Sequence, residues 1–223
     1  MVKTTASPAS ALTHSSVFPC LYPIVNVRSL EQGARHCEAL LRAGAELIQI
    51  RAKKLSNGEL IDLLSACLAL RDRVNRGAKI IVNDYPEACA AASADGVHLG
   101  QGDSSAKIAR ELLGSEAIIG LSTHSLAQIR QAPQGYLNYL AFGPIFTSST
   151  KSGHADPVGL DQLRLAAAST ELPLVAIGGI DLENAQSVFS AGADTVAVVS
   201  DLEGVQDLAV RLAAYQQAEL LTR

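Results

Sequence analysis

Residues 172–200 read LPLVAIGGIDLENAQSVFSAGADTVAVVS and contain one complete unit of the fold that this sequence predicts. Two apolar runs, LPLVAIGG from Leu172 and DTVAVV from Asp194, flank a segment that opens at Asp181, a residue type favoured at helix N-termini. Each run is continuous rather than alternating, as in a parallel strand that is covered on both faces. The stretch therefore predicts a strand–helix–strand unit.

The same pattern extends back towards the N-terminus. The six earlier runs are LYPIVNV from Leu21, ELIQIR from Glu46, KIIVND from Lys79, DGVHLG from Asp95, AIIGLS from Ala117 and NYLAFGP from Asn138. Each ends in a polar or glycine-containing turn. Eight strands that alternate with helices in 223 residues favour fold class α/β and a single closed (β/α)8 TIM barrel. An open Rossmann-like sheet is the alternative.

Apolar side chains recur at helical spacing between the runs. The predicted buried faces of the first two helices consist of Leu30, Ala34, Cys37 and Leu41, and of Leu60, Leu64 and Cys67. Ser29 and Asn57 are predicted to start these helices. We expect a flexible tail over residues 1–18, because this stretch lacks the apolar middle of a secretory signal, and a barrel domain over 19–223.

Composition narrows the function classes. A net charge of −4 and 4% aromatic residues argue against a nucleic-acid or acidic-membrane surface. No run approaches the roughly 18 apolar residues of a membrane span. The four cysteines lack C-x-x-C spacing, which favours a reducing cytoplasm. We expect a cytoplasmic protein with small-molecule partners, without a nucleic-acid or membrane partner, and compatible with a homo-oligomer.

Charged side chains cluster at the predicted strand ends, where barrel enzymes carry their chemistry. Gln49, Arg51 and Lys53 are spaced by two, so they point the same way if the strand continues. An arginine fork and a lysine suit the oxygens of a diphosphate, although a solvated basic strand end is the other interpretation. Asp84 and Asp103 end neighbouring strands and can share one Mg²⁺, or they can cap a turn and a helix.

The remaining strand ends carry hydroxyls, histidines and glycines. His98 fits a hydrogen-bonded core histidine as well as a catalytic one. Ser122 and His124 end the fifth strand, where a hydroxyl can donate to phosphate or begin a helix. The long loop GPIFTSSTKSGHADPVG carries hydroxyls and a lysine that can hold a phosphate, at Ser148, Ser149, Thr150 and Lys151. The glycines after the seventh strand and Ser200 after the eighth suit another phosphate group.

Seven motifs occur in a fixed order between residues 49 and 200: QIRAK at 49–53, VND at 82–84, DGVHLGQGD at 95–103, GLS at 120–122, GPIFTSSTK at 143–151, AIGGI at 176–180 and VAVVS at 196–200. Together they resemble the thiamine phosphate synthase family. HLGQ-x-D and GPIF-x-S/T-x-TK are its specific signals, whereas GGI occurs in many phosphate-binding barrels. Ser148 stands where the family usually has Thr, and VN at the end of the first strand replaces the common TD, which leaves the role of Asn26 open.

The resemblance implies a TIM-barrel transferase of thiamine biosynthesis. It places a pyrimidine diphosphate on Gln49, Arg51, Lys53, Asn83, Ser122 and Lys151, with Mg²⁺ on Asp84 and Asp103. It places a thiazole phosphate on Ser148, Ser149, Thr150, Gly179, Val199 and Ser200. The implied catalytic side chains are those of Arg51, Lys53, Lys151 and Ser122. A thiazole tautomerase-like relative and a non-catalytic sensor of phosphate ligands are the competing interpretations.

Overall fold

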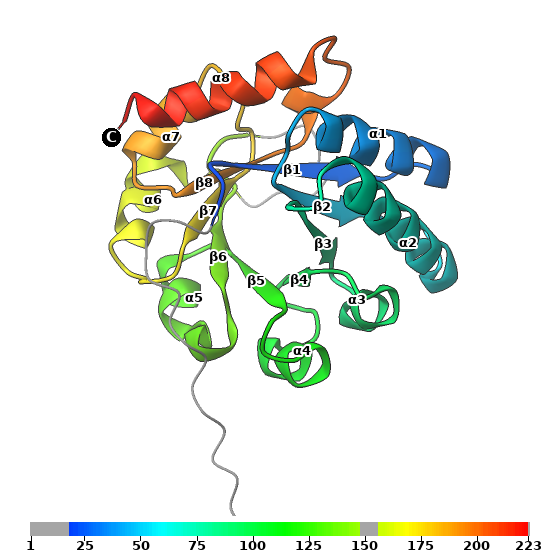
Figure 1. The fold of residues 1–223 in the computed structure, drawn as a ribbon. Helices are drawn as coiled ribbons and strands as arrows, with labels where there is room; N and C mark the ends of the chain where they lie inside the picture. Colours follow the sequence, from blue (N-terminus) through cyan, green and yellow to red (C-terminus); the bar gives the residue numbers. More distant parts are fainter. Residues whose placement is uncertain (1–17, 148–155, 223) are drawn as a thin grey trace, which may run out of the picture.

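The structure is a computed structural model that describes residues 18–147 and 156–222. A closed ring of parallel strands forms its centre, and helices surround the ring (Figure 1). The strands are Leu21–Asn26 (β1), Leu47–Arg51 (β2), Lys79–Asn83 (β3), Gly96–Leu99 (β4), Ile118–Thr123 (β5), Tyr139–Phe142 (β6), Leu174–Ile177 (β7) and Thr195–Val198 (β8). Because β8 pairs with β1 and closes the ring, the predicted (β/α)8 barrel is confirmed and the open sheet is wrong.

The helices follow the strands in strict alternation. They are Leu30–Arg42 (α1), Asn57–Val74 (α2), Pro86–Ala92 (α3), Ala106–Leu113 (α4), Leu126–Gln131 (α5), Gly159–Ala167 (α6), Ala185–Ser190 (α7) and Leu208–Leu220 (α8). Two short 3₁₀ helices, Gln134–Tyr136 (η1) and Ser200–Leu202 (η2), precede β6 and follow β8. Among the residues that the structure describes, no helix is long and apolar enough to cross a membrane.

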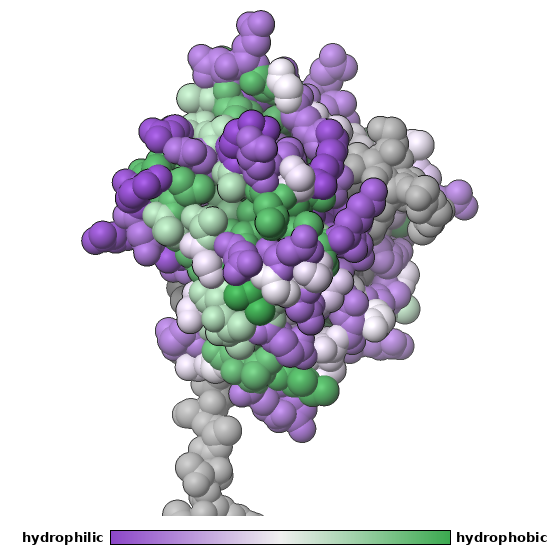
Figure 2. Space-filling view, turned by 90° about the vertical axis from the view of Figure 1, so that its right-hand side faces the viewer, coloured by the Kyte–Doolittle hydropathy of each residue, from purple (hydrophilic) through white to green (hydrophobic). Residues whose placement is uncertain are grey.

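Apolar side chains form two separate cores. The larger core lies between the strands and the helices. The smaller core consists of the inward-facing residues Tyr22, Ile24, Leu47, Ile81, Tyr139, Ala141, Val175 and Ala197. Phe18 packs against Tyr139 with ring centroids 5.1 Å apart. The outer side that carries α1 and α2 presents mainly hydrophilic residues with smaller apolar areas between them (Figure 2).

The helix boundaries confirm some of the predicted start signals and correct others. Ser29 caps α1 as expected, but α2 is capped by Ser56 rather than Asn57. The hydroxyl of Ser56 accepts from the amide of Glu59 while the Glu59 carboxylate accepts from the Ser56 amide, a complete capping box. Leu30 was expected on the buried face of α1 but is 39% exposed, so this part of the prediction is wrong.

The segment after β7 begins its helix later than expected. Asp181 and Asn184 bond reciprocally, each side-chain oxygen accepting from the other residue's backbone amide, at 3.1 and 3.2 Å. This pair forms a turn over residues 181–184, and α7 starts only at Ala185. Asp181 therefore stabilises the turn before the helix instead of capping the helix itself. The predicted tail falls largely on residues 1–17, which lie outside the described residues, and stays a prediction.

Candidate active site

The carboxyl ends of the parallel strands meet at one rim of the barrel. Gln49 and Arg51 lie on β2, Asn83 ends β3, and Ser122 lies one residue before the end of β5. Because the ring places β2 beside β3 and β4 beside β5, these side chains come from one arc of the rim.

Arg51 has a hydrogen-bond partner on the neighbouring strand. Its Nη1 donates a 2.9 Å bond to Oδ1 of Asn26, and the two residues are directly paired in the sheet. A guanidinium carries five N–H donors, so this bond orients the group and leaves donors for an anion. Asn26, whose role was open, is therefore the residue that orients Arg51.

Lys53 lies in the turn beyond β2, not on a longer strand as its spacing suggested. Its Nζ is 2.9 Å from Oδ2 of Asp84, so the turn after β2 and the end of β3 are joined by an ion pair. Asp84 has a φ of 71°, a left-handed conformation that Asp tolerates better than most non-glycine residues. The carboxylate of Asp84 therefore faces the basic segment at the end of β2.

Asp103 closes the turn after β4. Its Oδ2 accepts a 2.7 Å hydrogen bond from the backbone amide of Gly100. Partial desolvation raises the pKa of Asp103 above its usual value, and the adjacent carboxylate of Asp84 raises it further. The Gly100 amide and the charge of Lys53 act in the opposite direction on this pKa. The structure thus brings the two predicted acids together, with a lysine beside them.

The alternative uses of these acids were a turn cap for Asp84 and a helix cap for Asp103, and the structure shows that the helix cap is wrong. α3 begins after Tyr85 without a side-chain cap, and α4 is capped by Ser105, whose hydroxyl accepts a 3.3 Å bond from the amide of Ile108. Neither carboxylate is engaged at a helix start.

The paired carboxylates have the donor chemistry of a magnesium site. Mg²⁺ binds one or two protein carboxylates, retains waters and takes further oxygens from substrate phosphates. Within residues 18–147 and 156–222, no group of three or more His, Cys, Asp or Glu side chains is placed to hold a metal ion. The two acids therefore fit a cation that completes its coordination with ligand oxygens and do not fit a fully protein-bound ion.

Ser122 and Gln49 lie at the two ends of a buried polar chain. Nε2 of His98 is 2.8 Å from the Ser122 hydroxyl, and Nδ1 of His98 is 2.8 Å from the Tyr139 hydroxyl. The Tyr139 and Tyr22 hydroxyls are 3.1 Å apart, and Nε2 of Gln49 donates a 3.1 Å bond to Tyr22. His98 is 7% exposed and lies within hydrogen-bond distance of both the Ser122 and the Tyr139 hydroxyls inside the barrel.

Two further side chains stabilise the loops around this arc. Gln101 donates from Nε2 to the backbone carbonyl of Ser122 at 2.7 Å, which ties the loop after β4 to β5. His124 Nδ1 lies 2.6 Å from the carbonyl of Gly143, so it links the end of β5 to the loop after β6. These contacts give His124 a structural role.

The expected thiazole phosphate residues lie on the other arc of the rim. Gly179 has a φ of 64°, and a Cβ there would lie 2.5 Å from the Thr147 carbonyl oxygen, so only glycine fits beneath this loop. Val199 is partly exposed, and Ser200 is exposed at the start of η2. The predicted roles of residues 148–151 fall outside the described residues.

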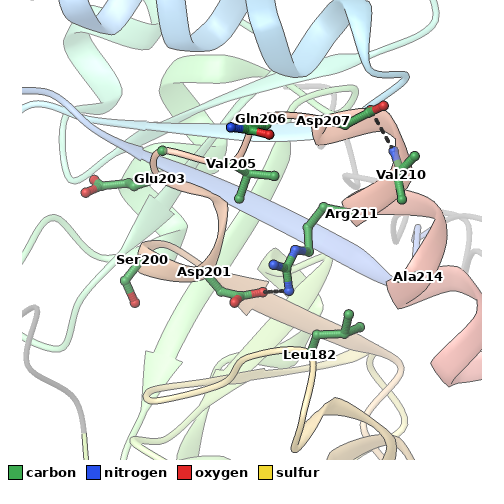
Figure 3. Close-up of a pocket in the computed structure, with 11 residues that line it drawn as sticks. Leu182, Ser200, Asp201, Glu203, Val205, Gln206, Asp207, Val210, Arg211 and Ala214 are labelled. Atoms are coloured by element: carbon green, nitrogen blue, oxygen red, sulfur yellow. Dashed lines mark hydrogen bonds and ion pairs between the residues drawn. The ribbon is translucent and has the colours of Figure 1, made fainter.

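A cavity of about 710 Å³ lies beside this arc, between the segment after β8 and the first turns of α8 (Figure 3). Arg211 reaches across it to Asp201, with 3.5 Å between Nη1 and Oδ2. Of the predicted site residues that the structure describes, only Ser200 lines this cavity. The diphosphate-type residues meet at the rim instead, so we place the candidate active site there.

Sequence patterns did not identify Tyr22 or Tyr139 as site residues. Both occur in apolar runs, where an aromatic residue predicts core packing. The one signal in the sequence was that Tyr22, His98 and Tyr139 lie on three strands of one predicted barrel, whose interior their side chains can share. Asn26 gave only the hint of a polar residue at a strand end.

The comparisons with known proteins identify the family. The family model described as thiamine monophosphate synthase matches residues 21–202. The chain belongs to this family. Thiamine-phosphate synthase of Caldicellulosiruptor saccharolyticus is 39% identical over 176 residues, which cover 78% of each chain. The corresponding protein of Moorella thermoacetica is 42% identical over 184 residues, 82% of this chain and 85% of that relative.

Thiamine phosphate synthase relatives are also found among solved structures. Thiamine phosphate pyrophosphorylase from Pyrococcus furiosus superposes with a TM-score of 0.78 at 30% sequence identity, over 91% of this chain and 96% of that chain. The resemblance based on the seven motifs is thereby confirmed. With it, the assignment as a transferase of thiamine biosynthesis is confirmed as well.

Proposed function

We propose that the protein couples 4-amino-2-methyl-5-hydroxymethylpyrimidine diphosphate with 4-methyl-5-(2-phosphoethyl)thiazole, or with its carboxylated form. The products are thiamine phosphate and diphosphate. The observation that carries this proposal is the cluster at the ends of β2, β3 and β4, where Lys53 contacts Asp84 at 2.9 Å and Asp103 lies beside them. A diphosphate bound with a divalent cation is the ligand that such a cluster suits.

The pyrimidine diphosphate contacts the arc from β2 to β5. Its proposed residues are Gln49, Arg51, Lys53, Asn83, Ser122 and Lys151. The fold supports the first five, since they lie on β2, β3 and β5 or in the turn after β2, whereas Lys151 rests on the motif alone. The Arg51 fork keeps unused donors after its bond to Asn26, and these suit the diphosphate oxygens.

Asp84 and Asp103 would hold Mg²⁺. When bound, the ion would neutralise part of the diphosphate charge and thereby favour its departure. The chain supplies the rest of the electrostatic stabilisation through Arg51, Lys53 and Lys151, whose charges would stabilise the negative charge that grows on the leaving group.

The reaction proceeds by departure of the leaving group before attack. The methylene–oxygen bond breaks, diphosphate takes the electron pair, and the electron-rich aminopyrimidine stabilises the resulting cation. The thiazole nitrogen then attacks that cation. The chain needs no nucleophile or strong base for these steps, so its main contributions are electrostatic stabilisation and the alignment of two rings.

The thiazole phosphate occupies the opposite arc. Its proposed residues are Ser148, Ser149, Thr150, Gly179, Val199 and Ser200. Gly179 supports this placement because its lack of a side chain lets backbone groups of two loops approach each other closely. Backbone amides exposed by such glycines suit a phosphate monoester.

The two competing interpretations lack support from the rim. A tautomerase-like relative does not require paired carboxylates with a lysine, because its reaction releases no diphosphate. A sensor of monophosphates likewise does not require a cation site suited to a diphosphate. We place the reaction in the cytoplasm, with the two small molecules as the partners and with a homo-oligomer as a further expectation.

The test is an incubation of the purified protein with both substrates and Mg²⁺, with EDTA in a parallel reaction. We expect thiamine phosphate and diphosphate in equal amounts, and neither product with EDTA. Absence of both products from a protein that unfolds cooperatively would contradict the proposal. Binding of the thiazole phosphate without turnover would then favour a sensor.

A further inference from the structure

The polar chain inside the barrel has a direction. Nε2 of Gln49 donates to Tyr22, so the Tyr22 proton is available to Tyr139. The Tyr139 hydroxyl then donates a hydrogen bond to Nδ1 of His98. The ring proton of His98 therefore lies on Nε2, which donates a hydrogen bond to the Ser122 hydroxyl. If instead every hydroxyl donated in the opposite direction, the Tyr22 hydroxyl would have no acceptor in this network. Tyr22 is 1% exposed, so this buried hydroxyl proton would stay unsatisfied, which is unfavourable.

This direction makes Ser122 a donor. Because its oxygen accepts from His98, its own proton is available to a ligand at the rim. Burial raises the pKa of both Tyr22 and Tyr139 well above the usual value for a phenol. Both hydroxyls therefore stay protonated, so the chain keeps its direction across the neutral pH range.

The Tyr139 ring is tightly packed inside the barrel. Gly120 is paired with Tyr139 across β5 and β6, and a Cβ at Gly120 would lie 2.0 Å from Cζ of the ring. The His98 ring stacks on Tyr139 with centroids 5.5 Å apart and an interplanar angle of 18°. Phe18 packs against the same ring. Tyr139 is 0% exposed, so its hydroxyl is held in place from several sides.

We propose that Tyr139 is a positioning residue: its hydroxyl fixes the Nε2–H tautomer of His98 and thereby turns Ser122 into a hydrogen-bond donor to the diphosphate. The role of Ser122 as a substrate contact rests on the proposed function. The tautomer of His98 does not, and it can be measured without substrate.

The same chain of hydrogen bonds also orients Gln49, the proposed contact of the pyrimidine ring. The bond from Nε2 of Gln49 to Tyr22 turns Oε1 of this amide away from Tyr22. An amide oxygen held in this way suits the exocyclic amino group of an aminopyrimidine. Tyr139 thus connects two of the proposed substrate contacts, Ser122 through His98 and Gln49 through Tyr22.

The first test is the ring ¹⁵N spectrum of histidine-labelled protein without substrate. The chain has five histidines, and a His98→Gln variant assigns the relevant signal. We expect a protonated Nε2 and an unprotonated Nδ1 in the wild type, and a mixture of tautomers in Tyr139→Phe. In Tyr22→Phe the donor to His98 remains, so the wild-type tautomer should persist. A protonated Nδ1 in the wild type, or an unchanged tautomer in Tyr139→Phe, would overturn the inference.

The second test is kinetic. Tyr139→Phe should lower kcat by about tenfold, less than the 10²–10³-fold typical of removing a direct donor, with the KM for thiazole phosphate changed by no more than about twofold. In a Ser122→Ala background the same substitution should have little further effect, because loss of the Tyr139 hydroxyl acts on Ser122 through His98, while the bond from Gln49 to Tyr22 remains. Independent, multiplying effects would indicate a merely structural role. Thermal unfolding of each variant establishes that it folds.

Thr195→Val is the matched control. It removes another buried hydroxyl bond, 2.9 Å from Oγ1 to the Pro19 carbonyl, at the start of β8 and away from the rim. We expect an unchanged kcat, and a loss as large as in Tyr139→Phe would overturn the kinetic claim. If the wild type makes no thiamine phosphate, the proposed function fails and the histidine spectrum alone decides the present inference.

Discussion

The rim contains one stabilising and one destabilising interaction, the attraction of Lys53 for Asp84 and the repulsion between Asp84 and Asp103. The 2.9 Å contact of Lys53 with Asp84 compensates one negative charge, and the second carboxylate remains in a partly desolvated turn with a raised pKa. Two like charges at close range destabilise the fold unless a cation joins them. Such an arrangement is typical of a binding site that has kept function at some expense of stability.

Asp103→Asn should separate these two effects. The amide oxygen can still accept from Gly100, and the repulsion with Asp84 disappears, so the unfolding temperature without metal should not fall. Turnover should fall by roughly 100-fold, because a metal ligand is lost. The measurements are thermal unfolding and steady-state kinetics over a range of Mg²⁺ concentrations.

Asp62→Asn is the matched control for this substitution, because Asp62 is exposed on α2. It should change neither the unfolding temperature nor the turnover. A strong loss of stability in Asp103→Asn with unaltered Mg²⁺ dependence would show that Asp103 only maintains the turn.

His36 predicts a pH dependence of stability. Burial lowers its pKa, helped by Arg28, while Glu203 and the Leu202 backbone act in the opposite direction. Nε2 of His36 is buried without a hydrogen-bond partner among the described residues. The unfolded chain therefore takes up a proton at a higher pH than the folded chain, and this term lowers stability as the pH falls below about 6.5.

His36→Gln should remove that dependence. We expect the free energy of unfolding, from urea titrations at about pH 7.5 and about pH 5.5, to fall less in the variant than in the wild type. An equal fall in both proteins would show that His36 titrates alike in the folded and unfolded states.

At the scale of single residues, the charged and amide groups of the site could be predicted from the sequence, whereas the residues that orient them, Asn26, Tyr22 and Tyr139, could not. Gln49 and Ser122 are polar residues within predicted strands, Gln49 in the middle of β2 and Ser122 one residue before the end of β5, and such positions indicate function. Tyr139 also packs as a core residue, and its hydroxyl partners come from β1 and β4, so no local pattern contains its second role. Strand pairing, which the sequence leaves implicit, brings these groups together.

At the scale of elements, the helix starts show how local competition decides a boundary. Ser56 and Asn57 are adjacent residues that both favour an N-cap, and Asn57 was predicted. Glu59 settles the choice, because it lies three residues after Ser56 and completes the capping box. A pattern that includes the third residue of the helix would have selected Ser56.

Ser56→Ala should therefore lower the free energy of unfolding by about 1 kcal/mol, the typical value of an N-cap, and Asn57→Ala should have a much smaller effect. Chemical denaturation of the two single variants measures both values. The reverse order would restore Asn57 as the cap.

The glycine of β5 gives a second prediction at this scale. Gly120→Ala introduces a Cβ 2.0 Å from the Tyr139 ring and should destabilise the barrel by roughly 1–3 kcal/mol, as overpacking does. Gly58→Ala is the control, since a Cβ at this α2 position meets nothing within 4 Å and alanine favours a helix. Gly120→Ala should also disturb the His98 spectrum. Equal stability of both variants would indicate that the ring has room to move.

At the scale of the whole molecule, the barrel follows from continuous apolar strands, helical periods between them and the order of eight such units. Parallel strands in a ring place all their carboxyl ends on one rim, so the neighbouring acids were predictable before any distance was known. Lys53 was expected to point the same way as Gln49 and Arg51 if the strand continued, but it lies in the turn, because spacing does not show where a strand ends. The turn brings it to Asp84 nonetheless.

The most direct test of the site is a crystal structure with Mg²⁺ and a non-reactive analogue of the pyrimidine diphosphate. We predict a metal ion that contacts Asp84 and Asp103, and diphosphate oxygens within hydrogen-bond distance of Arg51 and Lys53. Binding of the analogue in the cavity beside Arg211, with Asp84 still paired to Lys53 and no metal ion at the rim, would contradict the account.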